Sequence, residues 1–168
     1  MEVSAQYDNT LATYRLKYEQ HIPASLEEIW EFISSPHNLK VITPPYMGFI
    51  VTSEEVPEKM YPGLIITYKV SPVAGLPMPW VTEITQVKEG AYFVDEQRIG
   101  PYKLWHHEHH LEAVQGGVAM TDIIHYSPPM GILGAAANQL FIKKKLEEIF
   151  RFRKKKLEEI FGEWNKNR

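Results

Sequence analysis

The chain has 168 residues, of which 44% are hydrophobic and none is cysteine. It can therefore bury a core in one domain, while disulfides and thiolate metal sites are excluded. The formal net charge is −3, and no nucleic-acid partner is predicted. Residues 1–13 lack the segments of a secretory signal, and no apolar stretch is long enough to span a bilayer. We expect a soluble, cytoplasmic protein with a single domain over residues 1–168, in which residues 1–13 are a candidate disordered segment.

The charge is unevenly distributed along the chain. Residues 143–168 contain ten Lys or Arg and five Glu, a balance of +5, so the remainder carries −8. A basic segment on an acidic body is a candidate for contact with an anionic membrane or a nucleic acid. The solvated face of a helix has the same composition and is the simpler interpretation, so membrane contact is not expected to be the main interaction.

The first third of the chain predicts one strand and two short helices. Residues 14–22 alternate in the manner of a strand. Ser25 and Glu28 have the spacing of a capping box and predict a helix over residues 26–34. Pro36 begins a second helix, which ends near Ile42 because the residue before a proline resists the helical conformation.

The middle of the chain predicts strands separated by turns. A loop with three prolines occupies residues 72–79, and Gly116-Gly117 suits a two-residue hairpin turn. The predicted strands are residues 49–55, 64–71, 80–88, 91–99, 103–114 and 118–127.

The last part of the chain predicts one long amphipathic helix, over residues 132–164. The sequence Lys-Lys-Lys-Leu-Glu-Glu-Ile-Phe occurs at residues 143–150 and again at 154–161. The offset of eleven residues is almost three helical turns, so both copies face the same way. Two copies are too few for a solenoid.

This order of elements predicts an α+β fold. Consecutive antiparallel strands form a meander, and the terminal helix is the only large amphipathic element left to cover one face of it. We expect a curved antiparallel sheet of about six or seven strands around the C-terminal helix, with two short helices after the first strand. Space for a ligand tends to remain between such a sheet and helix.

Several segments are similar to the START-like, or SRPBCC, helix-grip superfamily, and in particular to its polyketide cyclase/dehydrase type. They are Ile42-Thr43-Pro44-Pro45 with Gly48-Phe49, Phe93 to Gln97 leading into Gly100-Pro101-Tyr102, Trp105-x-His107-x-His109-x-Leu111, Met120-Thr121-Asp122 with Tyr126, and Pro129-x-Gly131. The resemblance implies an apolar ligand in a cavity between the sheet and the C-terminal helix. It implies little about activity, because only some members are enzymes.

Four of the seven histidines lie in the run from Trp105 to His110. Strand alternation sends His107 and His109 to one face and His106 and His110 to the other. With the turn at Gly116-Gly117, Leu111 is expected opposite Asp122, His109 opposite Ile124, and His107 opposite Tyr126. The face with Trp105, His107, His109 and Asp122 carries more apolar bulk, so we assign it to the cavity. We expect His106, His110 and His125 on the outside.

Three interpretations of the inward polar residues stay open. His107, His109 and Asp122 satisfy one another by hydrogen bonds, or they anchor a mostly apolar ligand. In the third, Asp122 orients His109 as a general base, so that His109 and Asp122 are the candidate catalytic residues. Chemistry is the less favoured interpretation, because no nucleophile or oxyanion donor is identifiable. A metal site of these residues is not expected, and no cofactor is predicted.

The predicted ligand-binding residues share the inward face or lie near the proline-rich loop. They are Trp80, Phe93, Trp105, His107, His109, Met120, Asp122 and Tyr126. Asp95 and Gln97 share a face with Phe93. We expect them either in the cavity wall or on the protein surface, and the sequence favours neither location. Trp80, Met78 and Leu76 are candidates for the cavity mouth.

The function we expect is the binding of a small hydrophobic ligand, such as a lipid, an isoprenoid or an aromatic polyketide. One alternative is a cyclase- or dehydrase-type enzyme that uses the cavity His and Asp residues. Another is an adaptor at membrane surfaces that acts through the basic helix. The sequence carries no phosphate-loop, hydrolase-elbow or zincin motif.

Overall fold

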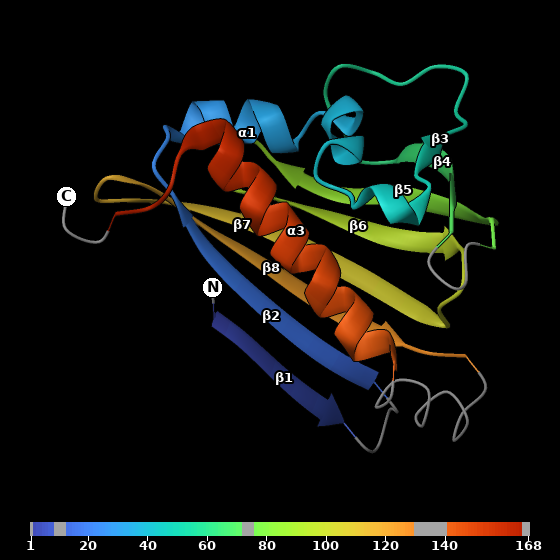
Figure 1. Cartoon of the computed structure of the whole chain (residues 1–168). Coiled ribbons are helices and arrows are strands. Elements are labelled where there is room, and N and C mark those ends of the chain that lie inside the picture. The colour runs from blue at the N-terminus through green and yellow to red at the C-terminus, as the bar shows by residue number, and fades with distance from the viewer. Residues whose placement is uncertain (1, 9–12, 72–75, 130–140, 166–168) are drawn as a thin grey trace.

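The computed structural model describes residues 2–8, 13–71, 76–129 and 141–165 (Figure 1). Within these residues, eight antiparallel strands form one sheet in the order β1-β2-β8-β7-β6-β5-β4-β3. The strands are β1 (Glu2–Asp8), β2 (Thr13–Ile22), β3 (Ile50–Val51), β4 (Leu64–Val70), β5 (Met78–Lys88), β6 (Tyr92–Ile99), β7 (Leu104–Val114) and β8 (Gly117–Ser127). The helices are α1 (Leu26–Ile33), the 3₁₀ helices η1 (Pro36–Lys40) and η2 (Pro45–Met47), and α3 (Lys143–Phe161).

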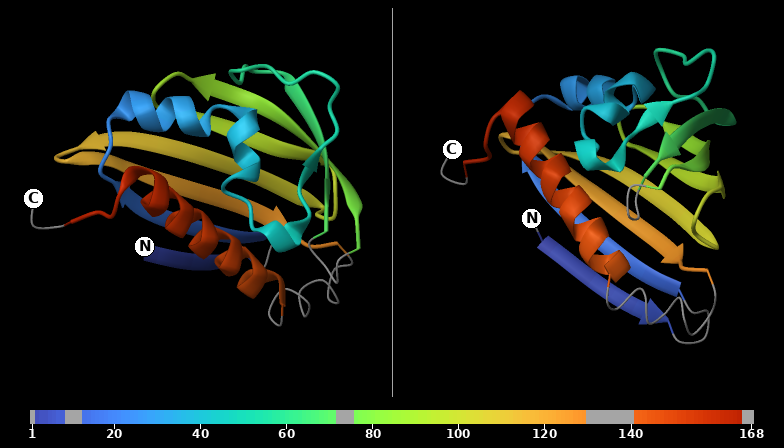
Figure 2. Two further views of the ribbon diagram at one scale, coloured as in Figure 1. Left: turned by 45° about the horizontal axis from the view of Figure 1, so that its top comes forward. Right: turned by 45° about the vertical axis from the view of Figure 1, so that its right-hand side comes forward.

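The long helix α3 lies diagonally across one face of the curved sheet (Figures 1 and 2). Its inward residues recur every three or four positions, which is the spacing of one helix face, and they include Leu146, Phe150 and Leu157. Leu146 and Phe150 pack with Leu16 of β2 and Ile124 of β8 in one buried cluster. The helix thereby covers the half of the sheet around β2 and β8.

The helix α1 covers one end of β7 and β8. A reciprocal capping box begins it: the Glu28 N–H donates to Ser25 Oγ at 3.2 Å, and the Ser25 N–H donates to the Glu28 carboxylate at 2.9 Å. Ile29, Trp30 and Ile33 form its buried face. Between α1 and β4, the 3₁₀ helices η1 and η2 lie over the other half of the sheet (Figure 2).

The structure confirms the predicted α+β architecture, in which a curved antiparallel sheet holds a C-terminal helix. It differs at the N-terminus, where residues 2–8, part of the candidate disordered segment, form β1 and pair with β2. Pairing through backbone hydrogen bonds does not need an apolar sequence, so the polar composition was misleading. The predicted strand 49–55 is reduced to Ile50–Val51. The long helix ends at Phe161 instead of residue 164, and its predicted beginning, residues 132–140, lies outside the described residues.

The register of the β7–β8 hairpin differs from the prediction by two residues. Val114 pairs with Gly117, so Gln115-Gly116 forms the turn, and His109 lies opposite Asp122 instead of Ile124. Gly116 has φ +88° there, a conformation that favours glycine. Because side chains alternate with a period of two, this shift leaves every residue on its predicted face. It changes only which residues are direct neighbours.

Candidate functional site

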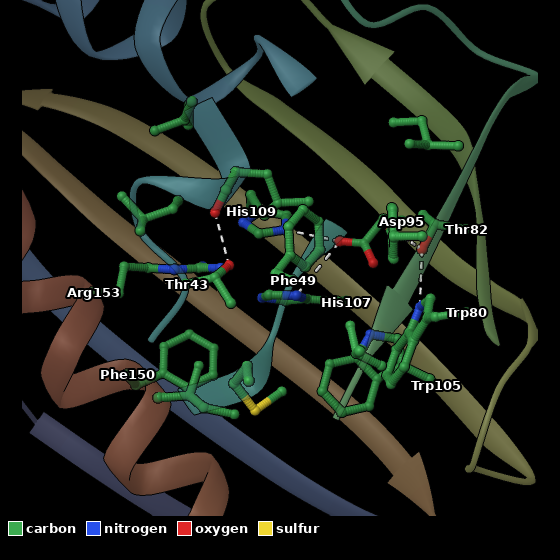
Figure 3. Close-up of a pocket in the computed structure, with 18 of the residues that line it drawn as sticks. Thr43, Phe49, Trp80, Thr82, Asp95, Trp105, His107, His109, Phe150 and Arg153 are labelled. Atoms are coloured by element: carbon green, nitrogen blue, oxygen red, sulfur yellow. Dashed lines mark hydrogen bonds and ion pairs between the residues drawn. The ribbon is translucent and has the colours of Figure 1, made fainter. Parts of the chain in front are cut away.

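A cavity of about 180 Å³ lies between the sheet, α3 and the segment that contains η1 and η2 (Figure 3). Most of its wall is apolar, with Met47, Phe49, Ile66 and Ile84 among the lining residues. One group of polar side chains, which we call the polar wall, comes from β6, β7 and α3 and consists of Asp95, His107, His109 and Arg153. An apolar cavity with a few grouped polar side chains is the usual form of a small-molecule site.

The polar wall is a two-by-two arrangement on three neighbouring strands. Asp95 of β6 lies directly opposite His107 of β7, and His109 of β7 lies directly opposite Asp122 of β8. All four side chains point to the helix-covered face, because alternate residues of a strand share a face. Each imidazole therefore has one carboxylate across from it and a second carboxylate on the diagonal.

Asp122 contacts one nitrogen of each imidazole. Its Oδ1 lies 3.0 Å from His107 Nε2 and 2.8 Å from His109 Nδ1. The other nitrogens of both rings face Asp95 Oδ2, at 3.4 Å for His107 Nδ1 and 2.9 Å for His109 Nε2. The two rings thus lie between two carboxylates.

Arg153 of α3 completes the group. Its side chain is 9% exposed, and its Nη1 donates to Asp122 Oδ1 at 2.9 Å. In Figure 3 the guanidinium and the Asp95 carboxylate lie on opposite sides of the two imidazoles. Arg153 Nε is buried and has no hydrogen-bond partner among the described residues. A buried donor without a partner is costly, so this atom is a candidate contact for a ligand.

Aromatic neighbours fix the orientation of the imidazoles. The Phe93 ring stacks on His109 with a centroid separation of 4.1 Å, and the two imidazole centroids are 3.8 Å apart. Trp105 and Phe150 meet the His107 ring edge to face. Such packing restricts the rotation of both rings and keeps their nitrogens directed at the carboxylates.

The two histidines differ in basicity. Burial, reinforced by the neighbouring His109, lowers the pKa of His107 to about 4. Burial by itself would lower the pKa of His109 also, but its contacts with Asp122 and Asp95 raise the pKa above the usual value. Burial likewise opposes ionisation of Asp122, yet the Arg153 charge and the bonds from both imidazoles hold its pKa well below the usual range. At neutral pH the group therefore contains a neutral His107 and an ionised Asp122.

A second polar point lies on β4 and β5. Thr82 Oγ1 accepts hydrogen bonds from the Tyr68 hydroxyl and from Trp80 Nε1, the latter at 3.0 Å. All three residues line the cavity. Burial and the nearby Asp95 raise the pKa of Tyr68, so its hydroxyl stays protonated and acts as a donor.

The structure places most of the predicted ligand-binding residues in the cavity wall. Trp80, Phe93, Trp105, His107, His109 and Met120 all line it. Asp122 and Tyr126 are buried behind the lining, Asp122 against the imidazoles and Tyr126 against Tyr14 and Tyr102. His106 and His110 lie on the other face beside Glu108, as their alternation predicts, and His125 is next to His106.

The structure also decides between the open candidates on β6. Asp95 lines the cavity, whereas the Gln97 amide donates to the Tyr102 carbonyl at 2.7 Å and accepts from its N–H, outside the lining. Of the three candidates for the cavity mouth, only Trp80 is in the lining. Leu76 is 65% exposed.

Sequence reasoning missed Arg153, Tyr68 and Thr82. A signal for Arg153 exists in the helix pattern, because residues 146, 150, 153 and 157 fall on one face and only the third is charged. For Tyr68 and Thr82, strand alternation gives the face but does not show which residues border empty space.

The exposed cations of α3 are mostly paired within the helix. Lys145 contacts Glu148, Lys154 contacts Glu158, and Lys155 and Lys156 both contact Glu159. The charge of this face is thus partly compensated along the helix itself. No helix in the described ranges is both long and apolar enough to cross a membrane.

The sheet, the gripped helix and the cavity between them define the helix-grip fold. Comparison with solved structures supports this assignment over nearly the whole chain. The protein Ms6760 of Mycobacterium smegmatis superposes with a TM-score of 0.64 at 20% identity, covering 95% of this chain and 97% of that one. A protein from Arthrobacter aurescens superposes with a TM-score of 0.68 at 13% identity, covering 93% and 91%.

A plant protein extends the comparison. The major latex-like protein 151 of Panax ginseng superposes with a TM-score of 0.65 at 16% identity, covering 89% of this chain and 98% of that one. No protein-family model and no curated protein matches the chain. The structural neighbours thus share the helix-grip fold with this chain at high coverage and low identity, and the likeness at this identity concerns the fold alone.

Proposed function

We propose that the protein binds a small, mostly hydrophobic molecule in the cavity between the sheet and α3. The observation that carries the proposal is the combination of an apolar cavity with a buried polar wall on one side. A cavity without function would be expected to be filled by side chains, because protein interiors pack as densely as organic crystals. Here large residues surround the space without filling it.

The volume restricts the size of the ligand. A cavity of about 150 Å³ accommodates benzene, whereas drug-sized ligands occupy about 300–1,000 Å³. The observed 180 Å³ therefore suits a molecule with one aromatic ring or a short isoprenoid. A long-chain lipid or a multi-ring polyketide would require the segment around η1 and η2, or the side chains of α3, to move outward.

The polar wall indicates where the polar end of the ligand would lie. Arg153 Nε is a buried donor without a partner, so it would be satisfied by a hydroxyl, carbonyl or carboxylate oxygen of the ligand. Trp105, Phe93 and Phe150 would contact the apolar part. The ligand would thus be an apolar ring or short chain that carries one oxygen acceptor.

A cavity-filling variant tests the proposal. Ile66 lines the cavity and is 2% exposed, while its neighbour Ile65 points outward and is 47% exposed. With phenol, which has one aromatic ring and one oxygen atom, we expect saturable binding to the unaltered protein in isothermal titration calorimetry with EDTA present. Ile66→Trp should reduce that binding at least tenfold, whereas Ile65→Trp should leave it unchanged. Equal binding by all three proteins would refute a role for the cavity. If only Ile66→Trp reduces binding, native mass spectrometry against isoprenoids and aromatic compounds would identify ligands.

The enzymatic alternative has one supporting contact, the 2.8 Å approach of Asp122 to His109. Both nitrogens of His109 already face a carboxylate, however, at 2.9 and 2.8 Å, so a substrate proton could reach neither nitrogen unless Asp95 or Asp122 moved. The membrane-adaptor alternative is weakened by the ion pairs along α3. A cytoplasmic location stays a prediction from the sequence.

A further inference from the structure

The arrangement of the polar wall has a second property besides ligand anchoring. Asp122 contacts His107 Nε2 and His109 Nδ1, and an ionised carboxylate can only accept hydrogen bonds. Each imidazole therefore places a proton on the nitrogen facing Asp122. In the neutral rings, the lone pairs of His107 Nδ1 and His109 Nε2 must then face the opposite way, towards Asp95.

Three acceptor atoms consequently converge at one point. His107 Nδ1 and His109 Nε2 lie 3.4 and 2.9 Å from Asp95 Oδ2, and ligand atoms of the three residues all lie within 4.8 Å of one another. Two lone pairs and a carboxylate oxygen repel one another unless a cation, either a proton or a metal ion, lies among them. Metal–ligand bonds of about 2.0–2.1 Å give ligand–ligand separations of about 3.0–3.4 Å, so Asp95 Oδ2 already lies near this spacing from both imidazole nitrogens.

We propose that Asp95, His107 and His109 form a binding site for a divalent transition-metal ion such as Zn²⁺. Two imidazoles and one carboxylate are a donor set that such ions prefer, and three protein ligands leave further positions open. All three residues line the cavity, so the open positions face the space where the small molecule would bind. An oxygen atom of that molecule would complete the coordination.

The neighbouring residues support the metal site. Histidines that bind metals usually donate their second N–H to a carboxylate, which fixes the tautomer and the ring orientation. Asp122 has this position for both imidazoles at once and is itself held by Arg153 at 2.9 Å. The Arg153 cation lies on the opposite side of the rings from Asp95 (Figure 3), so it neutralises Asp122 without occupying the space among the three ligands.

The sequence did not predict this site, because strand alternation alone does not show that Asp95 is opposite His107. The site goes beyond the proposed binding of an organic ligand and can be tested separately from it. Metal uptake is measured without any organic ligand, and probe binding is measured with EDTA present, so either can fail while the other holds.

Binding of Zn²⁺ and Co²⁺ alone provides the test. The protein, purified without a histidine tag and stripped with EDTA, should take up about one Zn²⁺ per chain in equilibrium dialysis. Asp95→Asn and His109→Gln should reduce the affinity at least 100-fold, and Asp122→Asn about 10- to 100-fold. The matched controls are His106→Gln and His110→Gln, which change histidines beside Glu108 on the outer face of β7. They should leave the affinity for Zn²⁺ unchanged.

A measurement on the unaltered protein tests the site even if the variants fail to fold. In NMR spectra, Co²⁺ should broaden the resonances of Phe93, Asp95, His107 and His109 before any others. Broadening centred on His110 and Glu108, or the absence of uptake at micromolar Zn²⁺, would overturn the proposal. Unchanged affinity in folded Asp95→Asn and His109→Gln would overturn it equally.

Discussion

Replacement of Arg153 by methionine should strongly destabilise the protein. Methionine keeps most of the apolar length of the side chain, so the main loss is the charge that contacts Asp122 at 2.9 Å. Removal of one partner from a buried ion pair costs about 3–5 kcal/mol, because the other charge stays buried. The His109 imidazole still contacts Asp122 at 2.8 Å, so we expect the lower end, about 3 kcal/mol.

Urea unfolding followed by circular dichroism at neutral pH, with EDTA present, measures this loss. The control is Arg151→Met, two positions along the same helix, where an exposed guanidinium lies 3.8 Å from Glu147 and the change should be within about 0.5 kcal/mol. Asp122→Asn combined with Arg153→Met should be less destabilising than the sum of the single variants by at least about 1.5 kcal/mol.

Two results would contradict this reasoning. One is a loss of less than about 1 kcal/mol in Arg153→Met, which would mean that the pair contributes no more than an exposed ion pair. The other is additivity of the two substitutions, which would mean that Asp122 and Arg153 are not coupled. If Arg153→Met does not fold at neutral pH, the same comparison can be made at lower pH, where protonation of the unpaired Asp122 should restore part of the stability.

Two further predictions concern acid stability and the β7–β8 hairpin. The pKa of Asp122 is held well below its unfolded value of about 3.9, so its contribution to the stability is complete above that pH and should disappear as the pH falls further. The urea midpoint of Asp122→Asn should therefore decline less between about pH 4 and 2 than the midpoint of the unaltered protein. Parallel profiles of the two proteins would refute this prediction. A Cβ at Gly117 would lie 2.1 Å from the Ile22 carbonyl oxygen, so Gly117→Ala should cost at least about 2 kcal/mol in urea unfolding. At Gly63, φ is also positive, but no atom would lie within 4 Å of an added Cβ, so Gly63→Ala should cost about 1 kcal/mol. An equal loss of stability in the two variants would contradict the clash at Gly117.

Much of the fold was predictable from local patterns. The capping box at Ser25, the alternation of β7 and β8, and the repeated amphipathic segment of α3 each depend on residues close together in the sequence. The same alternation placed His107, His109 and Asp122 on the inward face. An error of two residues in the hairpin register did not change that assignment, because a strand repeats every two residues.

The detailed site was not predictable, because it depends on contacts between distant segments. Asp95 is opposite His107 only through the β6–β7 register, and the neighbouring β5–β6 pairing contains an irregularity between Ile84 and Gln86 that no sequence signal revealed. Arg153 reaches Asp122 only because of the angle at which α3 crosses the sheet. The cavity volume depends on the packing of side chains from almost every element.

The most direct test of the proposed function is a crystal structure determined under xenon pressure, because xenon enters apolar cavities large enough to hold it. We expect a xenon site between the sheet and α3, surrounded by Met47, Ile66 and Phe93, which should be absent in Ile66→Trp. Side chains that fill this space in the experimental structure, with no xenon bound there, would contradict the account.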